Sequence, residues 1–394
     1  NSLKATRDGG YMFFGSALTH EVWVVKTAPD GGREWETRIP GRLGSEQQAI
    51  FGLESVDGGH LVIGRGNPVE IRSAEGAKAA ASRRDGSRGT HPFVMKLARN
   101  GELQWRRMLQ SRDGATYIRP VCGASIAGGY IVVATKPKIY ASHITSTGRT
   151  GVSHPLVMKI DDDGEVKWEV LIDEEEPGLL LDSGSVLGPK ACGGPVVDER
   201  GLVTFSLTVR LRPSLSSAEG RIVDGPGTID KSRFASLVIQ IDTSARIQGR
   251  RVIEGGLRAF LFRADSGFLV LDQATPVSGS PVRRTWIATD LTVTKQQEAS
   301  GPQGGLFGME MALQDADGSF HVLGHYVTPS NRRGHTAIVR LHPNGNLTDL
   351  RAIDHWYLPS EGAVAIARGR DKGEGAMLLR RDGDIALMHF RFEE

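Results

Sequence analysis

The sequence predicts an all-β protein, a seven-bladed β-propeller, on the strength of three observations. Short apolar segments of strand type recur along the whole 394-residue chain, and no sustained helical period occurs. Many of these segments follow the same kind of glycine turn. A lysine, a second turn and a tryptophan then follow at matched spacing in the first three units. Repetition of this kind indicates one supersecondary unit copied around a ring.

The glycine turn is clearest in "RDGGYMFFG" from Arg7, "VDGGHLVIG" from Val56 and "IAGGYIVVA" from Ile126. Glycine adopts positive φ without a Cβ clash, and aspartate tolerates it better than most residues, so these segments predict tight hairpin turns. Such turns anchor seven positions: Gly10, Gly59, Gly129, Gly201, Gly267, Gly318 and Gly375. Seven anchors predict seven units.

The second half of the unit is nearly superimposable in the first three copies. They read "VWVVKTAPDGGREWETRI" from Val22, "PFVMKLARNGELQWRRML" from Pro92 and "PLVMKIDDDGEVKWEVLI" from Pro155. Seven units in 394 residues average about 56 residues each, enough for four short strands and their turns. We therefore predict a single domain over residues 1–394, with approximate blades at 1–41, 42–110, 111–173, 174–254, 255–301, 302–354 and 355–394.

Radial stacking explains why the unit repeats. A four-stranded meander cannot bury both of its faces alone, whereas blades packed side by side bury them and protect most strand edges. The last blade is the exception, because the sequence ends at Glu394 after that unit's third strand. Either residues before Asn1 complete this blade, or it has three strands.

The pattern "DGGY...G" followed by "V.K.D..G...W" resembles the blades of bacterial β-propellers related to the PQQ-like and WD40-like repeats. The resemblance covers nearly the whole chain and is strongest in the first three units. It implies the fold rather than one activity, since such propellers include enzymes, assembly factors and adaptors. Trp35, Trp105 and Trp168 resemble the tryptophan that packs between PQQ-like blades. That role needs no quinone, and we expect no cofactor.

Composition points to neither nucleic acid nor a membrane span. The formal net charge is +2, with a sequence pI of about 8.5. No window approaches the roughly 18 uninterrupted apolar residues that a spanning helix needs. The chain begins at Asn1 rather than Met, which is consistent with a removed export signal. We expect a periplasmic or secreted protein.

The two cysteines, Cys122 and Cys192, are too few for a disulfide framework or a cysteine metal site. Each precedes a glycine near the start of the innermost strand of adjacent units. A disulfide requires Cα atoms roughly 4.4 to 6.8 Å apart, and inner strands of neighbouring blades are often farther apart. We therefore expect buried free thiols, with one disulfide as the alternative; a disulfide would favour an exported setting.

The irregular loops gather on one face. In a propeller meander, turns after the first and third strands lie on one face, and loops after the second and fourth strands lie on the other. The glycine turns occupy the first set. Long insertions follow the second strand of units two, three and four: Asn67 to His91, Lys136 to His154 and Arg210 to Ser232. Loops of this length are usually functional or disordered, so the alternative to a binding rim is decoration.

The rim mixes basic and acidic residues, which suits protein contact more than a phosphate groove. "DHWYLP" from Asp354, a connector on this face, carries aromatic residues of the type favoured in interfaces, although such residues also plug gaps between blades. A small-molecule ligand on this face is a further possibility. The candidate partner-binding residues are Arg83, Arg84, Arg88, Tyr140, His143, Arg149, His355, Trp356 and Tyr357.

Sequence motifs for catalysis or metal binding are missing. "DDDGE" from Asp161 resembles the start of a calcium loop, but it aligns with the hairpins of the other units and lacks the downstream glutamate. "CGASIAGG" from Cys122 does not complete a nucleophile elbow, and "GSVLGPKA" from Gly184 fails as a phosphate loop. We assign no catalytic residue and no metal ligand.

Two hypotheses follow. The first is a noncatalytic bacterial propeller that binds a protein through its loop-rich face, for example an immunity or accessory protein that masks a toxin or enzyme. The second is a hydrolase or lyase that acts on a glycan or peptide at the mouth of the propeller channel. A pocket holding a carboxylate pair, or a histidine with a perturbed pKa, would favour the second.

Overall fold

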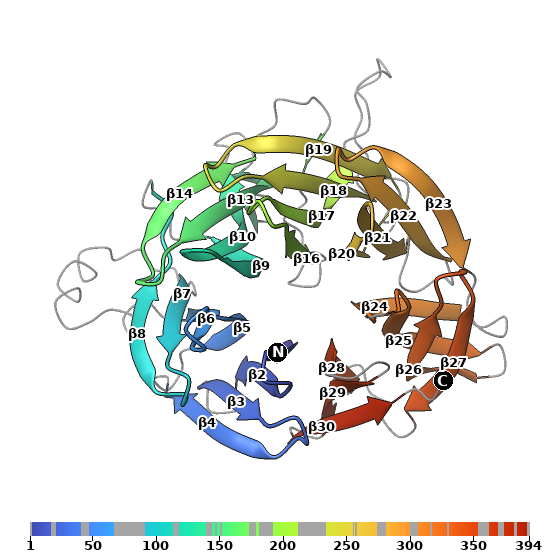
Figure 1. Cartoon of the computed structure of the whole chain (residues 1–394), viewed down its shortest axis with the longest axis horizontal. Coiled ribbons are helices and arrows are strands. Elements are labelled where there is room, and N and C mark those ends of the chain that lie inside the picture. The colour runs from blue at the N-terminus through green and yellow to red at the C-terminus, as the bar shows by residue number, and fades with distance from the viewer. Residues whose placement is uncertain are drawn as a thin grey trace.

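A computed structural model of the chain shows the seven-bladed β-propeller (Figure 1). Seven antiparallel sheets follow one another around a ring in chain order, and the first strand of the first blade contacts the first strand of the last. The structure describes residues 2–16, 21–40, 47–66, 91–112, 118–138, 144–145, 148–149, 152–172, 179–180, 192–211, 234–254, 256, 258–273, 281–299, 306–315, 317–328, 331–353, 362–368, 374–381 and 384–391.

Within each blade the strands run in order from the centre to the rim of the ring. Blades 1 to 3 contain β1 (Ser2–Ala5), β2 (Tyr11–Ser16), β3 (Val22–Thr27), β4 (Arg33–Ile39), β5 (Gln48–Glu54), β6 (His60–Gly66), β7 (His91–Leu97), β8 (Leu103–Met108), β9 (Arg119–Ile126), β10 (Gly129–Lys138), β13 (Val152–Ile160) and β14 (Val166–Leu171). A small hairpin of β11 (Ile144–Thr145) and β12 (Gly148–Arg149) lies between β10 and β13.

Blades 4 to 7 complete the ring. Their strands are β15 (Leu179–Leu180), β16 (Cys192–Val197), β17 (Val203–Leu211), β18 (Phe234–Ile241), β19 (Ile247–Glu254), β20 (Arg258–Ala264), β21 (Gly267–Gln273), β22 (Val282–Ala288), β23 (Val293–Ala299), β24 (Leu306–Gln314), β25 (Phe320–Thr328), β26 (Asn331–Leu341), β27 (Leu347–Ile353), β28 (Gly362–Arg368), β29 (Glu374–Arg381) and β30 (Asp384–Arg391). Blade 4 gains the short strand β15, and blade 7 has three strands among the described residues. The sequence likewise provides no obvious fourth strand for this blade.

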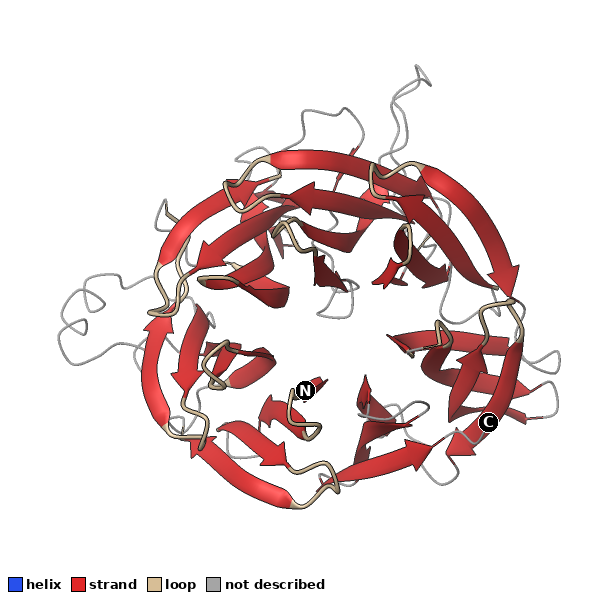
Figure 2. Cartoon of the chain, in the orientation of Figure 1, coloured by secondary structure: helices blue, strands red, loops and turns tan. Residues whose placement is uncertain are grey.

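Strands and turns make up the described part of the chain, as Figure 2 shows. The described residues contain no helix long and apolar enough to cross a membrane.

Regular hairpin turns define one face of the ring. In blade 1, the Thr6 amide donates to the Gly10 carbonyl and the Gly9 amide donates to the Thr6 carbonyl, and the same pair of bonds recurs in blades 2, 4 and 6. A second repeated turn joins the third and fourth strands, where Gly101 and its equivalents have positive φ. Asp161, at the start of "DDDGE", accepts hydrogen bonds from the amides of Asp163 and Glu165 and so caps one of these turns.

The hydrophobic core lies between blades rather than within them. Phe14 and Val24 of blade 1 pack with Val62 and Phe93 of blade 2, and similar clusters join the other blades around the ring. Because each sheet is apolar on both faces, neither face is buried until a blade lies on each side.

The tryptophans pack between blades, as the sequence predicted. A Cβ on Gly101 of blade 2 would lie 2.5 Å from the Trp35 ring of blade 1, and a Cβ on Gly164 of blade 3 would lie 2.6 Å from the Trp105 ring. Each ring therefore rests on a bare glycine in the next blade. The Trp168 Nε1 donates to the Thr243 carbonyl of blade 4 at 2.9 Å.

Blades 4 to 6 use other residues at these joints. Gly249 occupies the position of the tryptophan in blade 4, and Leu291 of blade 5 occupies the position of the glycine, at a φ of 65°. The Leu291 side chain fills the space over Gly249, so the large and small residues are exchanged. Between blades 5 and 6, the buried Arg284 donates to the carbonyls of His342 and Pro343, each at 2.9 Å.

The fourth strands, which form the outer rim of the ring, carry exposed charged side chains. Exposed Arg33, Arg107, Arg250 and Lys295 lie on β4, β8, β19 and β23 respectively. Charged side chains on an edge strand oppose pairing with another chain, so these strands terminate their sheets.

Replacement of Gly101 by alanine tests the Trp–Gly joint. The new Cβ meets the Trp35 ring in addition to the strain of positive φ, so we expect Gly101→Ala to lower the free energy of unfolding by about 2–4 kcal/mol in chemical denaturation. Gly128→Ala is the matched control, because Gly128 also has positive φ (72°) but nothing lies within 4 Å of its Cβ position. Gly128→Ala should lower the free energy of unfolding by about 1 kcal/mol. Equal losses in the two variants would contradict the packing role of Trp35.

Candidate functional site

Strand ends on the face opposite the short turns border three long insertions. β6 ends at Gly66 and β7 begins at His91, in blade 2. In blade 4, β17 ends at Leu211 and β18 begins at Phe234. Blade 3 lies between these two and carries the third insertion, so the strand ends that border the three insertions belong to three consecutive blades.

Most of the predicted partner-binding residues lie outside the described part of the chain. These are Arg83, Arg84, Arg88, Tyr140, His143, His355, Trp356 and Tyr357. Arg149 is described only through its backbone, which pairs with Ile144 in the β11–β12 hairpin. Their grouping into one surface therefore stays a prediction.

In blade 3, the second and third strands pair over a longer stretch than the equivalent strands of blade 1. Pairing between β10 and β13 continues to Lys138 and Val152, and β10 is 10 residues long. In blade 1, the corresponding pairing stops at Ser16 and Val22 after 6 residues. The longer ladder projects the base of this insertion from the face.

A polar network centred on the buried Ser111 supports this base. The Lys136 Nζ donates to Ser111 Oγ at 3.0 Å, and Ser111 Oγ donates to Glu169 Oε1 at 2.7 Å. The Arg112 amide donates to the other carboxylate oxygen at 2.8 Å. Since Ser111 and Arg112 belong to the connector that enters blade 3, the network ties that connector to the second and outer strands of the blade. The sequence contains no local signal that brings these residues together.

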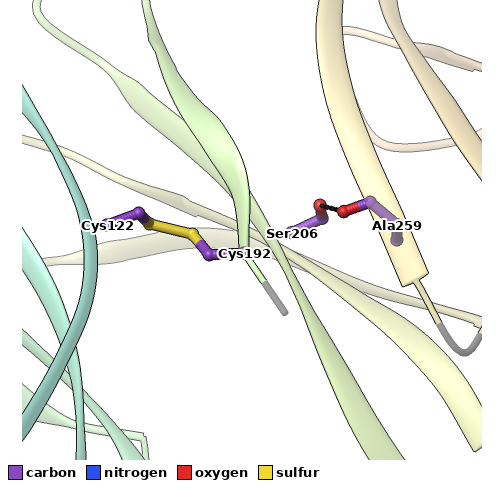
Figure 3. The surroundings of a disulfide bond; sticks show 4 residues. All are labelled: Cys122, Cys192, Ser206 and Ala259. Atoms are coloured by element: carbon purple, nitrogen blue, oxygen red, sulfur yellow. Dashed lines mark hydrogen bonds between the residues drawn. A yellow bond between two sulfur atoms is a disulfide. The ribbon is translucent and has the colours of Figure 1, made fainter. Parts of the chain in front are cut away.

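The expectation of free thiols was wrong. Cys122 of β9 and Cys192 of β16 form a disulfide with their Cα atoms 6.1 Å apart (Figure 3). The innermost strands of blades 3 and 4 contact each other directly, which brings the two residues within the required range. The bond therefore links the two innermost strands of blades that carry insertions.

This disulfide anchors a weak segment of the sheet. β16 begins Cys-Gly-Gly-Pro, and its pairing with β17 shifts register between Gly193 and Val196. Glycine adds backbone freedom and proline donates no hydrogen bond, so backbone pairing alone holds this strand poorly. On the other side of blade 4, Ser206 Oγ donates to the Ala259 carbonyl of blade 5 at 3.5 Å (Figure 3).

Buried cations meet aspartates near the short turns. Lys26 of β3 pairs with Asp8 at 3.0 Å, Lys96 of β7 with Asp57 at 3.2 Å, and Arg340 of β26 with Asp317 at 2.8 Å. Each cation comes from a third strand and each carboxylate from the first turn of the same blade. Each of these cations is therefore paired with a carboxylate of its own blade.

One of these pairs belongs to a cluster with catalytic residue types. The Lys96 Nζ donates to Ser55 Oγ and, at 2.9 Å, to Tyr130 Oη, and Ser55 Oγ also contacts Tyr130 Oη. Burial disfavours the charged form of Lys96, but its contacts with Tyr130 and Asp57 outweigh burial and raise its pKa.

The Ser55–Lys96–Tyr130 cluster is not arranged for catalysis. A lysine that activates a serine must accept a proton, whereas the raised pKa keeps Lys96 protonated. Ser55 and Tyr130 are each 1% exposed, so no substrate reaches the serine oxygen while the blades stay packed. The cluster is a buried joint between blades 2 and 3.

His60 occupies the equivalent joint between blades 1 and 2. It is 2% exposed and lies beside the Trp35 ring, with the ring centroids 5.7 Å apart. Burial, followed by the positive charge of Lys26, lowers the pKa of His60 to about 4. Its Nδ1 has no hydrogen-bond partner among the described residues. A perturbed histidine is therefore present, but it lies within the joint rather than in a pocket.

Comparisons with known proteins give similar solved structures but no family. No protein-family model and no curated protein matches the chain. Among solved structures, the β-propeller domain of Cps50 (Swd1) from Myceliophteria thermophila is 10% identical with a TM-score of 0.48, over 97% of this chain and 98% of that domain. The β-propeller domain of the Trilobed protease from Pyrococcus furiosus, described as an open velcro topology, is 8% identical with a TM-score of 0.41, over 99% and 93%.

A third similar structure is the Hadza microbial sialidase Hz136, which is 13% identical with a TM-score of 0.46, over 94% of this chain and 73% of that one. None of the three TM-scores reaches 0.5, and we infer no function from these similarities.

Reduction of the disulfide should destabilise the propeller without unfolding it at room temperature. The bond closes a loop between residues 70 apart in sequence, and removing such a crosslink typically costs about 2–4 kcal/mol. We expect a lower denaturation midpoint in the presence of reductant. Cys122→Ala/Cys192→Ala should show the same midpoint with and without reductant. A wild-type midpoint that does not respond to reductant would contradict the bond.

Protonation of His60 should contribute to the pH dependence of the free energy of unfolding. The pKa of His60 is lower in the folded state than in the unfolded state. Its contribution to the free energy of unfolding is therefore fully present above pH 6.5 and is lost as the pH falls toward 4. Between pH 7.5 and pH 5 we expect a loss of about 2 kcal/mol in denaturation experiments. His60→Tyr should remove this loss, because the equivalent Tyr11 and Tyr130 do not titrate there. Identical pH profiles for the two proteins would refute the assignment.

Proposed function

We propose that this protein is a noncatalytic scaffold that binds a partner protein through the loop-rich face of blades 2, 3 and 4. The observation that carries the proposal is the asymmetry between the two faces. On one face, repeated tight turns close the hairpins. On the other, residues 67–90, 139–151 and 212–233 separate the second and third strands of three consecutive blades.

The described polar residues support a binding role over catalysis. Lys26, Lys96 and Arg340 are buried and paired with aspartates, and the Ser55–Lys96–Tyr130 cluster excludes substrate. No group of three histidines, cysteines or acidic residues gathers as a metal site in the part of the chain that the structure describes. The alternative of a glycan or peptide hydrolase or lyase has no comparable support, because His60, the histidine shown to have a lowered pKa among the described residues, is buried.

A more specific form of the proposal is an exported bacterial immunity or accessory protein that masks a toxin or enzyme. Its support is the disulfide, since such bonds persist in oxidising compartments such as the periplasm. The relation of the blades to PQQ-like and WD40-like repeats belongs to the same proposal and rests on the sequence pattern.

Charge reversal on the rim tests the binding surface. The rim carries basic residues in all three insertions, so the variant Arg83→Glu/Arg84→Glu/Arg149→Glu should weaken capture of the partner from the native cell extract by at least about tenfold. The readout is the amount of the stoichiometric partner retained, identified first with the wild-type protein.

The opposite face provides the matched control. Arg99, Arg200 and Arg246 are exposed and lie in the short turns, so Arg99→Glu/Arg200→Glu/Arg246→Glu changes the net charge equally. Capture by this control should equal that of the wild type. Undiminished capture by the rim variant, or equal losses in both variants, would reject the loop-rich face as the binding surface.

A further inference from the structure

The innermost strands of the seven blades surround the centre of the ring (Figure 1), and one lysine on these strands has no partner. Lys4, on β1, is exposed and forms no hydrogen bond or ion pair with the residues that the structure describes. The chain nevertheless surrounds it closely enough that burial lowers the pKa of its ammonium group. A side chain that solvent reaches while protein surrounds it lies in a concave part of the surface.

Strand register shows the direction in which Lys4 projects. Lys4 pairs with Met12 of β2, and directly opposite residues of an antiparallel pair project from the same face of the sheet. Met12 packs in the core cluster between blades 1 and 2. Lys4 therefore projects from that face, beside β5 of blade 2. It lies near the end of β1, next to the short turn that begins at Thr6.

The equivalent residue of every other blade is apolar. Each of these residues pairs with the residue of its own second strand that corresponds to Met12. The resulting layer consists of Lys4, Leu53, Ala124, Val196, Phe262, Leu313 and Ala367. Ala124, Val196, Phe262 and Leu313, from blades 3 to 6, are only half-buried. Since they lie on innermost strands, their exposed parts face the centre of the ring.

The apolar lining continues toward the loop-rich face. Two residues before Phe262 and Leu313 on the same strands, Phe260 and Met311 are also half-buried. The nearest carboxylate on β24, that of Glu310, lies 3.9 Å from His325 Nε2. The centre of the ring thus presents partly exposed apolar side chains over two successive layers, with the ammonium of Lys4 in the layer nearer the short turns.

The next level toward the short turns carries charges of both signs. Arg263, beside Phe262 on β20, is exposed, and Glu54 of β5 accepts a hydrogen bond from the Arg7 amide at 2.9 Å. Glu54 is therefore held by the turn of blade 1, and the ammonium of Lys4 is left without a carboxylate.

Sites for small ligands are concave and mostly apolar, with a few polar groups that fix the orientation of the ligand. An ammonium among apolar side chains favours an anion, because an opposite charge nearby stabilises its charged form. We propose that the centre of the ring binds an amphipathic carboxylate. Its carboxylate group lies on Lys4 Nζ, and its apolar chain runs along Phe262, Leu313 and Met311. This site lies on the innermost strands and does not rest on the function proposed for the rim of blades 2 to 4.

Octanoate is the direct probe, because it combines one carboxylate with an apolar chain. Calorimetric titration of the full chain with monomeric octanoate should show saturable binding at one site. Butyrate, with a shorter chain, and 1-octanol, with no charge, should each bind at least about tenfold more weakly. Absence of saturable binding, or equal binding of octanoate and 1-octanol, would overturn the proposal.

Two lysine variants separate the central site from general attraction to a basic protein. Lys4→Met removes the ammonium and should weaken octanoate binding at least about tenfold, whereas Lys4→Arg should retain binding. Lys295→Met is the matched control, because Lys295 is exposed on the outer strand β23 and its loss changes the net charge equally. The control should bind octanoate as the wild type does. Equal binding by Lys4→Met and Lys295→Met would refute the role of Lys4.

Chemical labelling locates the ligand in the wild-type chain and does not depend on whether a variant folds. Acetylation of lysines, followed by mass spectrometry of the peptides, reports how accessible each ammonium is. Saturating octanoate should slow acetylation of Lys4 at least about fivefold and leave that of Lys295 unchanged. Unchanged acetylation of Lys4 at saturation, or equal slowing at both lysines, would show that octanoate binds elsewhere and would reject the central site.

Discussion

Packing between blades is the interaction on which the rest of the structure depends. Each sheet is apolar on both faces, so the hydrophobic clusters form only where two blades meet, as Phe14 of blade 1 meets Phe93 of blade 2. The tryptophans and several of the short turns pack at these joints. Because every blade needs two neighbours, the ring must close, and closure places β28 of the last blade against β1 of the first.

The joints share a geometry but use different chemistry. Trp35 rests on Gly101, whereas Gly249 accepts Leu291 and Arg284 reaches the backbone of blade 6. Each arrangement fills the same space with a complementary pair, since a close-packed interior tolerates neither a void nor an overlap. The repeat therefore becomes fainter in sequence after blade 3 while its geometry persists. The polar clusters around Lys96 and His60 belong to these joints, where they are buried between blades.

The difference between the two faces of the ring follows from the same packing between blades. Residues in the short turns pack on neighbouring blades, so insertions there would disturb the joints. On the other face, residues 67–90, 139–151 and 212–233 separate the second and third strands of blades 2 to 4. The disulfide joins two of these blades at their innermost strands, where β16 has the least backbone support.

The sequence alone determined the all-β class, the number of blades and the face of each loop, because strand periodicity and turn glycines act over a few residues. The resemblance to PQQ-like blades also implied that Trp35 and Trp105 pack between blades, and the structure has them there. Only the tertiary structure decided the Cys122–Cys192 bond, the Ser55–Lys96–Tyr130 cluster and the burial of His60. These features depend on distances between residues of different blades, and such distances are set by the packing of the whole ring, which no local pattern records.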